Sequence, residues 1–154
     1  MTTFIGIIIS ISLAYIAYQN YLIVKASFFI QKDKLRLDLF DKRYRIFRAL
    51  QDLLSVFIPT GTFTRKDLNK FTNDSSDAEF LFGKDIKIYV DEINQKVLKL
   101  IHLNERLANP VLETEKKNSA IKEIAELESW FMNQLTDSKN LFKKYLHFSI
   151  DKNP

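Results

Sequence analysis

The sequence predicts an all-α protein in which a single N-terminal transmembrane helix is followed by an antiparallel three-helix cytoplasmic bundle. Residues 1–24 contain no charged side chain, and the later apolar residues recur at steps of three and four, the period of a helix. Alternation with a period of two, which would indicate strands, occurs only in short stretches inside longer helical patterns. The expected organisation is an anchor at residues 1–24, a helical body at 25–150 and a tail at 151–154.

Composition excludes several classes of protein. The 154 residues include 3 Gly, 3 Pro and no Cys, which leaves no disulfide or thiolate–zinc framework and little material for a phosphate-binding glycine loop. His102 and His147 have no carboxylate or second histidine at metal-ligand spacing. We therefore expect no cofactor, no metal and no enzymatic activity.

The uncharged N-terminal segment has the length of a membrane span. Residues 4–24 would form a helix about 31 Å long, and the hydrocarbon core of a bilayer is about 30 Å thick. A cleavable signal peptide would begin with basic residues and would have small residues at both specificity positions, but no Lys or Arg precedes Phe4, and Tyr15 stands two positions before Ala17. A buried helix of a soluble protein is the alternative, and such helices seldom extend for 24 residues without a charge. The sequence thus predicts a retained anchor in contact with membrane lipid.

Aromatic and basic residues predict the direction of the anchor. The residues expected at the membrane interface are Tyr15, Tyr18, Tyr21 and Lys25. Three further basic residues, Lys32, Lys34 and Arg36, follow on this side, whereas the other flank has none. Because positively charged segments stay in the cytoplasm, we expect the N-terminus outside and the C-terminal domain inside.

The first helix of the body should end at Pro59, and its pattern is compatible with one helix running on from the anchor. The apolar residues expected on its buried face, spaced three or four apart with Gln51 as the one polar residue, are Leu37, Phe40, Tyr44, Phe47, Leu54 and Ile58. The apolar side chains cover an arc of roughly 200°, wider than the 100° or so that one docking surface needs. The helix should therefore contact more than one neighbour, either the other two helices or a second subunit.

Three further helices are expected. A short helix should be capped by Thr64 with Asp67, a long one should begin after Ser76 or Asp77 and stop at residues 109–110, and another should begin near Asn118 or Ser119. In the first of the two long helices, the apolar residues at helical spacing are Ile86, Val90, Ile93, Val97, Leu100 and Leu107, with Asn104 as the one polar residue. In the second, they are Ile124, Leu127, Phe131, Leu135, Phe142 and Tyr145, with Ser138 as the polar residue.

Six residues are candidates for interaction or for fixing helix register: Arg36, Arg43, Phe40, Phe47, Phe80 and Phe82. Arg36 and Arg43 align with the apolar side of the first helix. Their stems could lie on apolar surface with the charged heads in water, or one of them could meet a carboxylate from a later helix. The carboxylates considered are Asp85, Asp91, Glu92 and Glu126. Residues 80–82 could plug the end of the bundle or dock a partner, and Gly83 would permit a kink between two helical pieces.

The excess of positive charge is confined to one segment. Residues 25–58 have 8 basic and 4 acidic side chains, and the remainder is balanced. This distribution disfavours a nucleic-acid partner, although residues 42–48 keep that reading open as a third possibility.

Two stretches carry a family resemblance. Residues 34–43, KLRLDLFDKR, followed by YRIF, and residues 78–83, AEFLFG, resemble the hallmark motifs of a widespread group of uncharacterised small bacterial single-span proteins. The resemblance covers residues 15 to 95, and it implies a bacterial inner-membrane protein with a helical cytoplasmic domain. It implies no catalytic residue.

These features predict a non-enzymatic, membrane-anchored interaction or assembly protein that self-associates or joins a larger complex. The alternative is a membrane-active effector or toxin-like component, for instance in phage defence, that acts by oligomerising its span. Gly6 and Ser10 provide a small-residue pair for that alternative.

Overall fold

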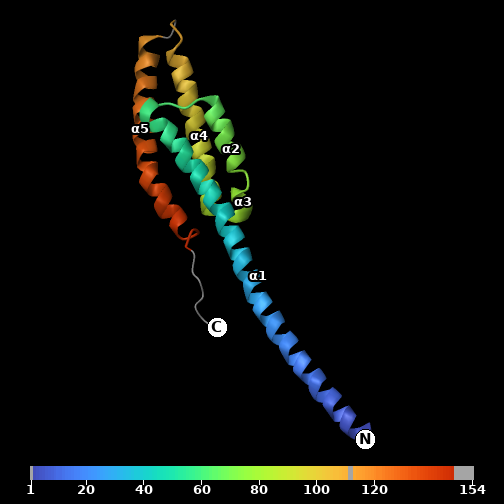
Figure 1. Cartoon of the computed structure of the whole chain (residues 1–154). Coiled ribbons are helices and arrows are strands. Elements are labelled where there is room, and N and C mark those ends of the chain that lie inside the picture. Colours follow the sequence, from blue (N-terminus) through green and yellow to red (C-terminus); the bar gives the residue numbers. More distant parts are fainter. Residues whose placement is uncertain (1, 111–112, 148–154) are drawn as a thin grey trace. The chain divides into compact units, whose positions relative to one another are not determined.

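The computed structural model describes residues 2–110 and 113–147, and in these ranges every regular element is a helix (Figure 1). The expected all-α class is confirmed. The helices are α1 (Thr2–Thr60), α2 (Arg65–Asp74), α3 (Ala78–Leu81), α4 (Lys84–Leu107) and α5 (Thr114–Lys143). The expected tail at 151–154 lies outside the described residues. The chain divides into two compact units, Met1–Leu39 and Phe40–Pro154, called here the N-terminal and C-terminal units.

The N-terminal unit consists of the first part of α1. Among the described residues, α1 is the one helix long and apolar enough to cross a membrane. From Phe4 to Leu39 no described side chain is buried. Two hydroxyls in this stretch bond within the helix, because Ser10 donates to the carbonyl of Gly6 and Ser12 to that of Ile8, each at 2.9 Å.

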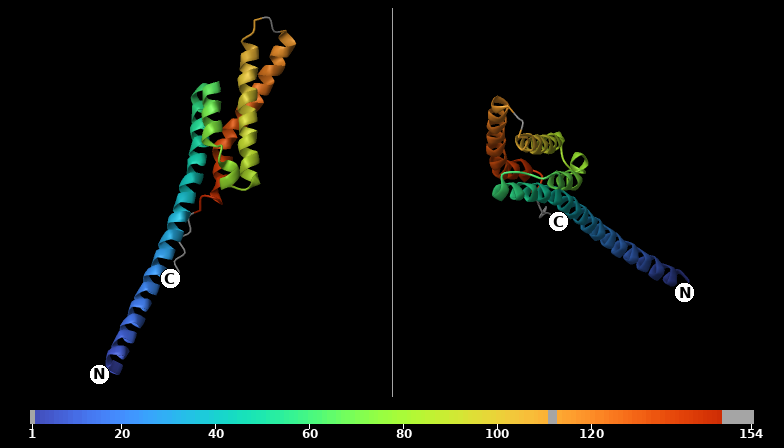
Figure 2. Two further views of the ribbon diagram at one scale, coloured as in Figure 1. Left: turned by 90° about the vertical axis from the view of Figure 1, so that its right-hand side faces the viewer. Right: turned by 90° about the horizontal axis from the view of Figure 1, so that it is seen from above.

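The C-terminal unit has a core built from all of its helices. Figure 2 shows α4 and α5 side by side, running in opposite directions, with α2 along the other side of α4. The buried residues of α4 are Ile86, Val90, Ile93, Val97, Leu100, Ile101 and Leu103, and those of α5 are Ala120, Leu127, Phe131, Gln134, Ser138 and Phe142. Five of the six apolar steps expected for α4 are therefore buried, and Leu107 packs against the core half-buried.

The expected buried face of α1 was partly wrong. Tyr44 and Ile58 are exposed, and the buried residues are Ile46, Leu50, Leu53, Leu54 and Phe57. Apart from Leu54, which was expected, the buried residues each lie one position before an expected one, which corresponds to a rotation of the buried face by about 100° around the helix axis. The apolar arc of α1 is wide enough to contain two overlapping rows of apolar side chains. Packing against the other helices determines which row is buried.

Helix ends follow local chemistry. The side chain of Thr64 accepts from the backbone N–H of Asp67, and the Asp67 carboxylate accepts from the N–H of Thr64, so the expected capping box is confirmed. Helix does begin after Asp77, as expected, but this first piece is the short α3, and Phe82 and Gly83 separate it from α4. Helix α5 begins at Thr114, earlier than expected.

Polar side chains of the C-terminal unit form hydrogen bonds between segments that are distant in sequence. The Asn104 amide donates to Thr62 at 2.8 Å, and the Tyr89 hydroxyl donates to the buried Gln134 at 2.8 Å. Burial raises the pKa of Tyr89. These bonds offset the cost of removing polar groups from water.

Candidate interaction site

Three elements of the C-terminal unit meet around Arg43: α1, the junction between α3 and α4, and the end of α5. We call this set of residues the Arg43 cluster; its members are Arg43, Phe47, Leu81, Phe82, Gly83, Asp85, Phe142, Lys144 and Tyr145. The cluster contains three of the six expected interaction residues, namely Arg43, Phe47 and Phe82.

Arg43 contacts a backbone carbonyl and two aromatic rings. Its Nε donates to the carbonyl oxygen of Leu81 at 2.8 Å, and its guanidinium carbon lies 5.7 Å from the ring centre of Phe82 and 5.5 Å from that of Tyr145. Neither of the two alternatives considered for Arg43 is met in full, because its head bonds to a backbone carbonyl and not to a carboxylate of a later helix. Leu81 ends a short helix whose last carbonyls have no partner within the helix, so Arg43 satisfies an acceptor that the helix end leaves open.

Aromatic rings connect the three elements. The ring of Phe142 lies 5.4 Å from that of Phe47 and 5.3 Å from that of Phe82, and Phe82 is edge-on to Tyr145 at 5.2 Å. Phe40, another expected residue, stacks on Tyr44 at 5.9 Å. Such ring pairs add stability beyond the area they bury.

The other two expected residues lie elsewhere. Phe80 is 84% exposed, whereas Phe82 is 8% exposed, so within residues 80–82 one phenylalanine fills the core and the other remains on the surface. Arg36 belongs to the N-terminal unit, where it lies 3.9 Å from Asp33.

Tyr145 joins the start of α4 to the end of α5. Its hydroxyl accepts from the backbone N–H of Gly83 at 3.2 Å and donates to Oδ1 of Asp85 at 2.7 Å, while Lys144 Nζ lies 2.8 Å from Oδ2 of Asp85. The hydrogen bonds from Lys144 and Tyr145 lower the pKa of Asp85 to about 2. The same carboxylate raises the pKa of Lys144.

Gly83 leaves the space that the Tyr145 hydroxyl occupies. A Cβ at this position would lie 2.5 Å from that oxygen and 2.8 Å from Oδ1 of Asp85. The φ of Gly83 is −75°, which any residue can adopt, so glycine is needed here for room and not for backbone freedom. The sequence signalled Gly83 as a junction and Asp85 as a partner for a cation, but gave no sign of the role of Tyr145.

The four expected membrane-interface residues, Tyr15, Tyr18, Tyr21 and Lys25, are all exposed on α1 in the N-terminal unit. This exposure is compatible with their expected place at a membrane surface, which stays a prediction.

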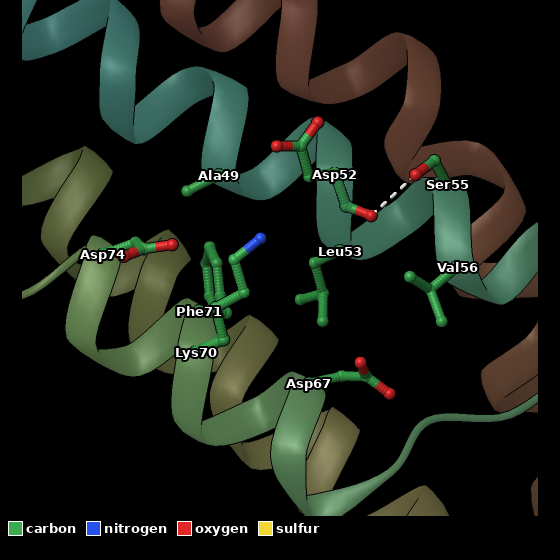
Figure 3. Close-up of a pocket in the computed structure, with 9 residues that line it drawn as sticks. All are labelled: Ala49, Asp52, Leu53, Ser55, Val56, Asp67, Lys70, Phe71 and Asp74. Atoms are coloured by element: carbon green, nitrogen blue, oxygen red, sulfur yellow. Dashed lines mark hydrogen bonds between the residues drawn. The ribbon is translucent and has the colours of Figure 1, made fainter.

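A groove lies between α1 and α2 in the C-terminal unit. It has a volume of about 210 Å³, and Figure 3 shows residues of α1 facing residues of α2 across it. Two of its carboxylates already have partners, because Asp67 belongs to the capping box, which lowers its pKa, and Asp52 lies 3.7 Å from Arg48. In the described ranges, no group of three or more His, Asp or Glu side chains is placed to hold a metal ion.

Comparisons of the chain with protein-family models, with curated proteins and with solved structures gave no match.

Proposed function

We propose that this protein is a non-enzymatic, membrane-anchored interaction or assembly protein. In this proposal residues 1–24 cross the inner membrane of a bacterium with the N-terminus outside. The rest of the chain forms an antiparallel three-helix bundle in the cytoplasm, which binds further copies or the other subunits of a complex. The resemblance of residues 34–43 and 78–83 to small single-span proteins supports the same assignment.

The observation that carries the proposal is that no side chain of the apolar anchor from Phe4 to Val24 is buried. Every large apolar side chain from Phe4 to Val24 is at least 40% exposed. Leaving one such side chain in water costs about 1.5–3 kcal/mol relative to burial, so this helix requires an apolar environment that the N-terminal unit itself does not provide. A helix satisfies its own backbone hydrogen bonds and can therefore lie in lipid.

The Arg43 cluster supports a structural role over catalysis. Its charged groups already have partners, since Asp85 binds Lys144 and Tyr145, and Arg43 binds the carbonyl of Leu81. Surface suited to a partner is found instead at Phe80 and at Ile88 of α4, which are 84% and 65% exposed. Phenylalanine is among the residue types enriched at protein–protein interfaces.

The test of the anchor uses the absence of cysteine from the natural chain. Single-cysteine variants Thr3→Cys and Ser129→Cys are expressed in bacteria and treated in intact spheroplasts with a maleimide that does not cross membranes. We expect labelling of Thr3→Cys at once and of Ser129→Cys only after lysis, and we expect the chain to stay in membranes washed with carbonate. Release by carbonate, or the reverse labelling pattern, would contradict the proposal.

The test of assembly is cross-linking in native membranes followed by mass spectrometry. We expect cross-linked species containing either a second copy or a constant set of membrane proteins. A strictly monomeric particle in mild detergent, together with no cross-linked neighbour, would argue against an assembly role.

A membrane-active effector is the second candidate. The feature that favours it is the pair of small side chains at Gly6 and Ser10 of α1. These residues are one helical turn apart, and the Ser10 hydroxyl bonds to the Gly6 carbonyl. Spans that oligomerise often meet at such small residues. Induced expression should then stop growth and collapse the membrane potential, whereas harmless overexpression excludes this candidate.

A further inference from the structure

A second groove of the C-terminal unit lies between α4 and α5, the two helices that run side by side in opposite directions (Figure 2). It has a volume of about 540 Å³. Its lining includes two aromatic residues, two carboxylates and two amides, which are Tyr89, Trp130, Glu92, Asp137, Gln134 and Asn140. We call it the Asp137 groove. Aromatic rings and negative charges share this one concave surface.

One wall of the Asp137 groove already binds a cation from the same chain. The Lys96 ammonium group lies 4.6 Å from the ring centre of Trp130 and 3.5 Å from a carboxylate oxygen of Glu92. Trp130 and Lys96 are both half-buried. The face of an aromatic ring attracts a cation, and the attraction is stronger where water is partly excluded. The chemistry of this wall therefore suits a basic side chain.

The other carboxylate of the groove has no cation. In the part of the chain that the structure describes, Asp137 forms no ion pair and no hydrogen bond. Its charge acts on the groove, because burial and then the charges of Asp137 and Glu92 raise the pKa of Tyr89. The Tyr89 hydroxyl donates to Gln134 at 2.8 Å, and the buried Gln134 amide donates to the carbonyl of Trp130 at 3.1 Å. A negative charge thus stands uncompensated beside side chains that are held in place.

We infer that the Asp137 groove binds an arginine side chain on a basic segment of a different protein. This inference rests on the proposed function and states the chemistry of the partner. A guanidinium group can donate two parallel hydrogen bonds to one carboxylate, and its flat face can lie on an aromatic ring. Water can solvate Asp137 as well, but only a ligand with an apolar stem also covers the half-buried rings of Tyr89 and Trp130.

A second copy of this chain is a poorer source of that arginine. Most of its own arginines already have partners, namely Arg36 with Asp33, Arg43 with the carbonyl of Leu81, Arg48 with Asp52 and Arg65 with Glu105. A basic segment of another protein brings arginines that are not engaged in this way.

The fluorescence of Trp130 reports directly on the groove, because it is the one tryptophan of the chain. The full-length chain is placed in nanodiscs of phosphatidylcholine, whose surface is neutral. The probe is a capped pentapeptide with two arginines separated by glycine. We expect a saturable change in emission with this peptide, a weaker change with lysines in place of arginines, and none with glutamates. No saturable change, or tighter binding of spermidine than of the arginine peptide, would overturn the inference.

Asp137→Asn tests the charge itself. It should weaken binding of the arginine peptide about 3- to 10-fold. Asp74→Asn is the matched control, because it removes the same charge from an exposed residue at the end of α2, outside the groove. Asp137 is exposed and forms no bond within the described chain, so both variants should unfold at the same temperature as the natural chain. Equal loss of binding in the two variants, or full binding by Asp137→Asn, would overturn the inference.

Photo-cross-linking in native membranes tests the identity of the partner. A benzophenone amino acid replaces Asn140 in the groove or, as the control, the exposed Lys139, which points about 100° away around α5. We expect adducts from position 140 that mass spectrometry maps to an arginine-containing segment of another protein, and none of these from position 139. Adducts with a second copy of this chain, or with segments that lack arginine, would overturn the inference.

Failure of this contact can be told apart from failure of the proposed function. A chain that is cross-linked to membrane proteins elsewhere, but whose Trp130 does not respond to the arginine peptide, refutes the groove and leaves the assembly role intact. A chain that has no cross-linked neighbour at any position refutes both.

Discussion

The amide nitrogen of Gln51 on α1 donates a 2.9 Å hydrogen bond to the hydroxyl oxygen of Ser138 on α5. Ser138 is fully buried, and Gln51 is half-buried. This bond joins residues 87 positions apart. It satisfies both polar groups inside the core, where groups that lack partners are costly.

Ser138→Ala should destabilise the protein by about 1–3 kcal/mol, because it leaves the Gln51 amide without its acceptor. The measurement is urea unfolding in mild detergent, followed by circular dichroism. The control is a double-mutant cycle with Gln51→Leu, in which the two changes together should cost less than their sum by about 0.5–1.5 kcal/mol. Simple additivity of the two changes would mean that the bond contributes nothing.

Gly83→Ala should destabilise the protein by about 1–3 kcal/mol through overcrowding, because the new methyl group would meet the Tyr145 hydroxyl and Oδ1 of Asp85. Thermal unfolding in detergent measures the loss. Gly61 provides a contrast, since its φ is +64° while an added Cβ there would be 3.5 Å from Glu128. Gly61→Ala should cost about 1–2 kcal/mol through backbone strain.

Removing the Tyr145 hydroxyl distinguishes crowding, the expected cause at Gly83, from backbone strain, the expected cause at Gly61. Tyr145→Phe removes the closer of the two contacts that the methyl group would make, so in that background Gly83→Ala should cost less than it does in the natural chain. The cost of Gly61→Ala should stay the same in that background. If Tyr145→Phe does not lower the cost of Gly83→Ala, crowding by the Tyr145 hydroxyl is not the cause.

Acid should remove the contribution of Asp85 to stability. Its pKa is about 2 in the folded protein, below the usual value of about 3.9 for an unfolded chain. The folded state therefore binds fewer protons than the unfolded state between these values. The contribution is complete above about pH 4 and is lost as the pH falls toward 2.

Asp85→Asn isolates this effect from other carboxylates. The natural chain should be more stable than Asp85→Asn at pH 6, and the difference in unfolding midpoint should close near pH 2. Lys144→Gln should raise the pKa of Asp85 and shift the loss to higher pH. A difference between the natural chain and Asp85→Asn that does not change with pH would contradict the role of the charge.

Local features of this chain could be predicted from its sequence. The helical period identified the buried positions of α4, and the Thr64 and Asp67 spacing identified the cap of α2. These signals depend on neighbours within a few residues, so they need no knowledge of the packing. The uncharged stretch at residues 4–24 is equally local.

Features that depend on packing could not be predicted. The buried face of α1 was displaced by one residue because its apolar arc exceeds what one contact requires. Arg43 was expected either to extend its head into water or to bind a carboxylate, but it bonds to a carbonyl at the end of α3, and Asp85 is held by Lys144. Each of these outcomes is decided by a competition between partners that are distant in sequence.

Arg43→Lys should destabilise the protein by about 1–2 kcal/mol despite keeping the charge. The planar guanidinium places Nε at the Leu81 carbonyl while its face covers Phe82 and Tyr145, and the ammonium group of lysine cannot do both. Urea unfolding in detergent measures the change. Arg45, an exposed residue of the same helix, serves as the control, and Arg45→Lys should change stability by less than about 0.5 kcal/mol. Equal effects at the two positions would show that Arg43 acts through charge alone, because only the geometry of its contacts distinguishes it from Arg45.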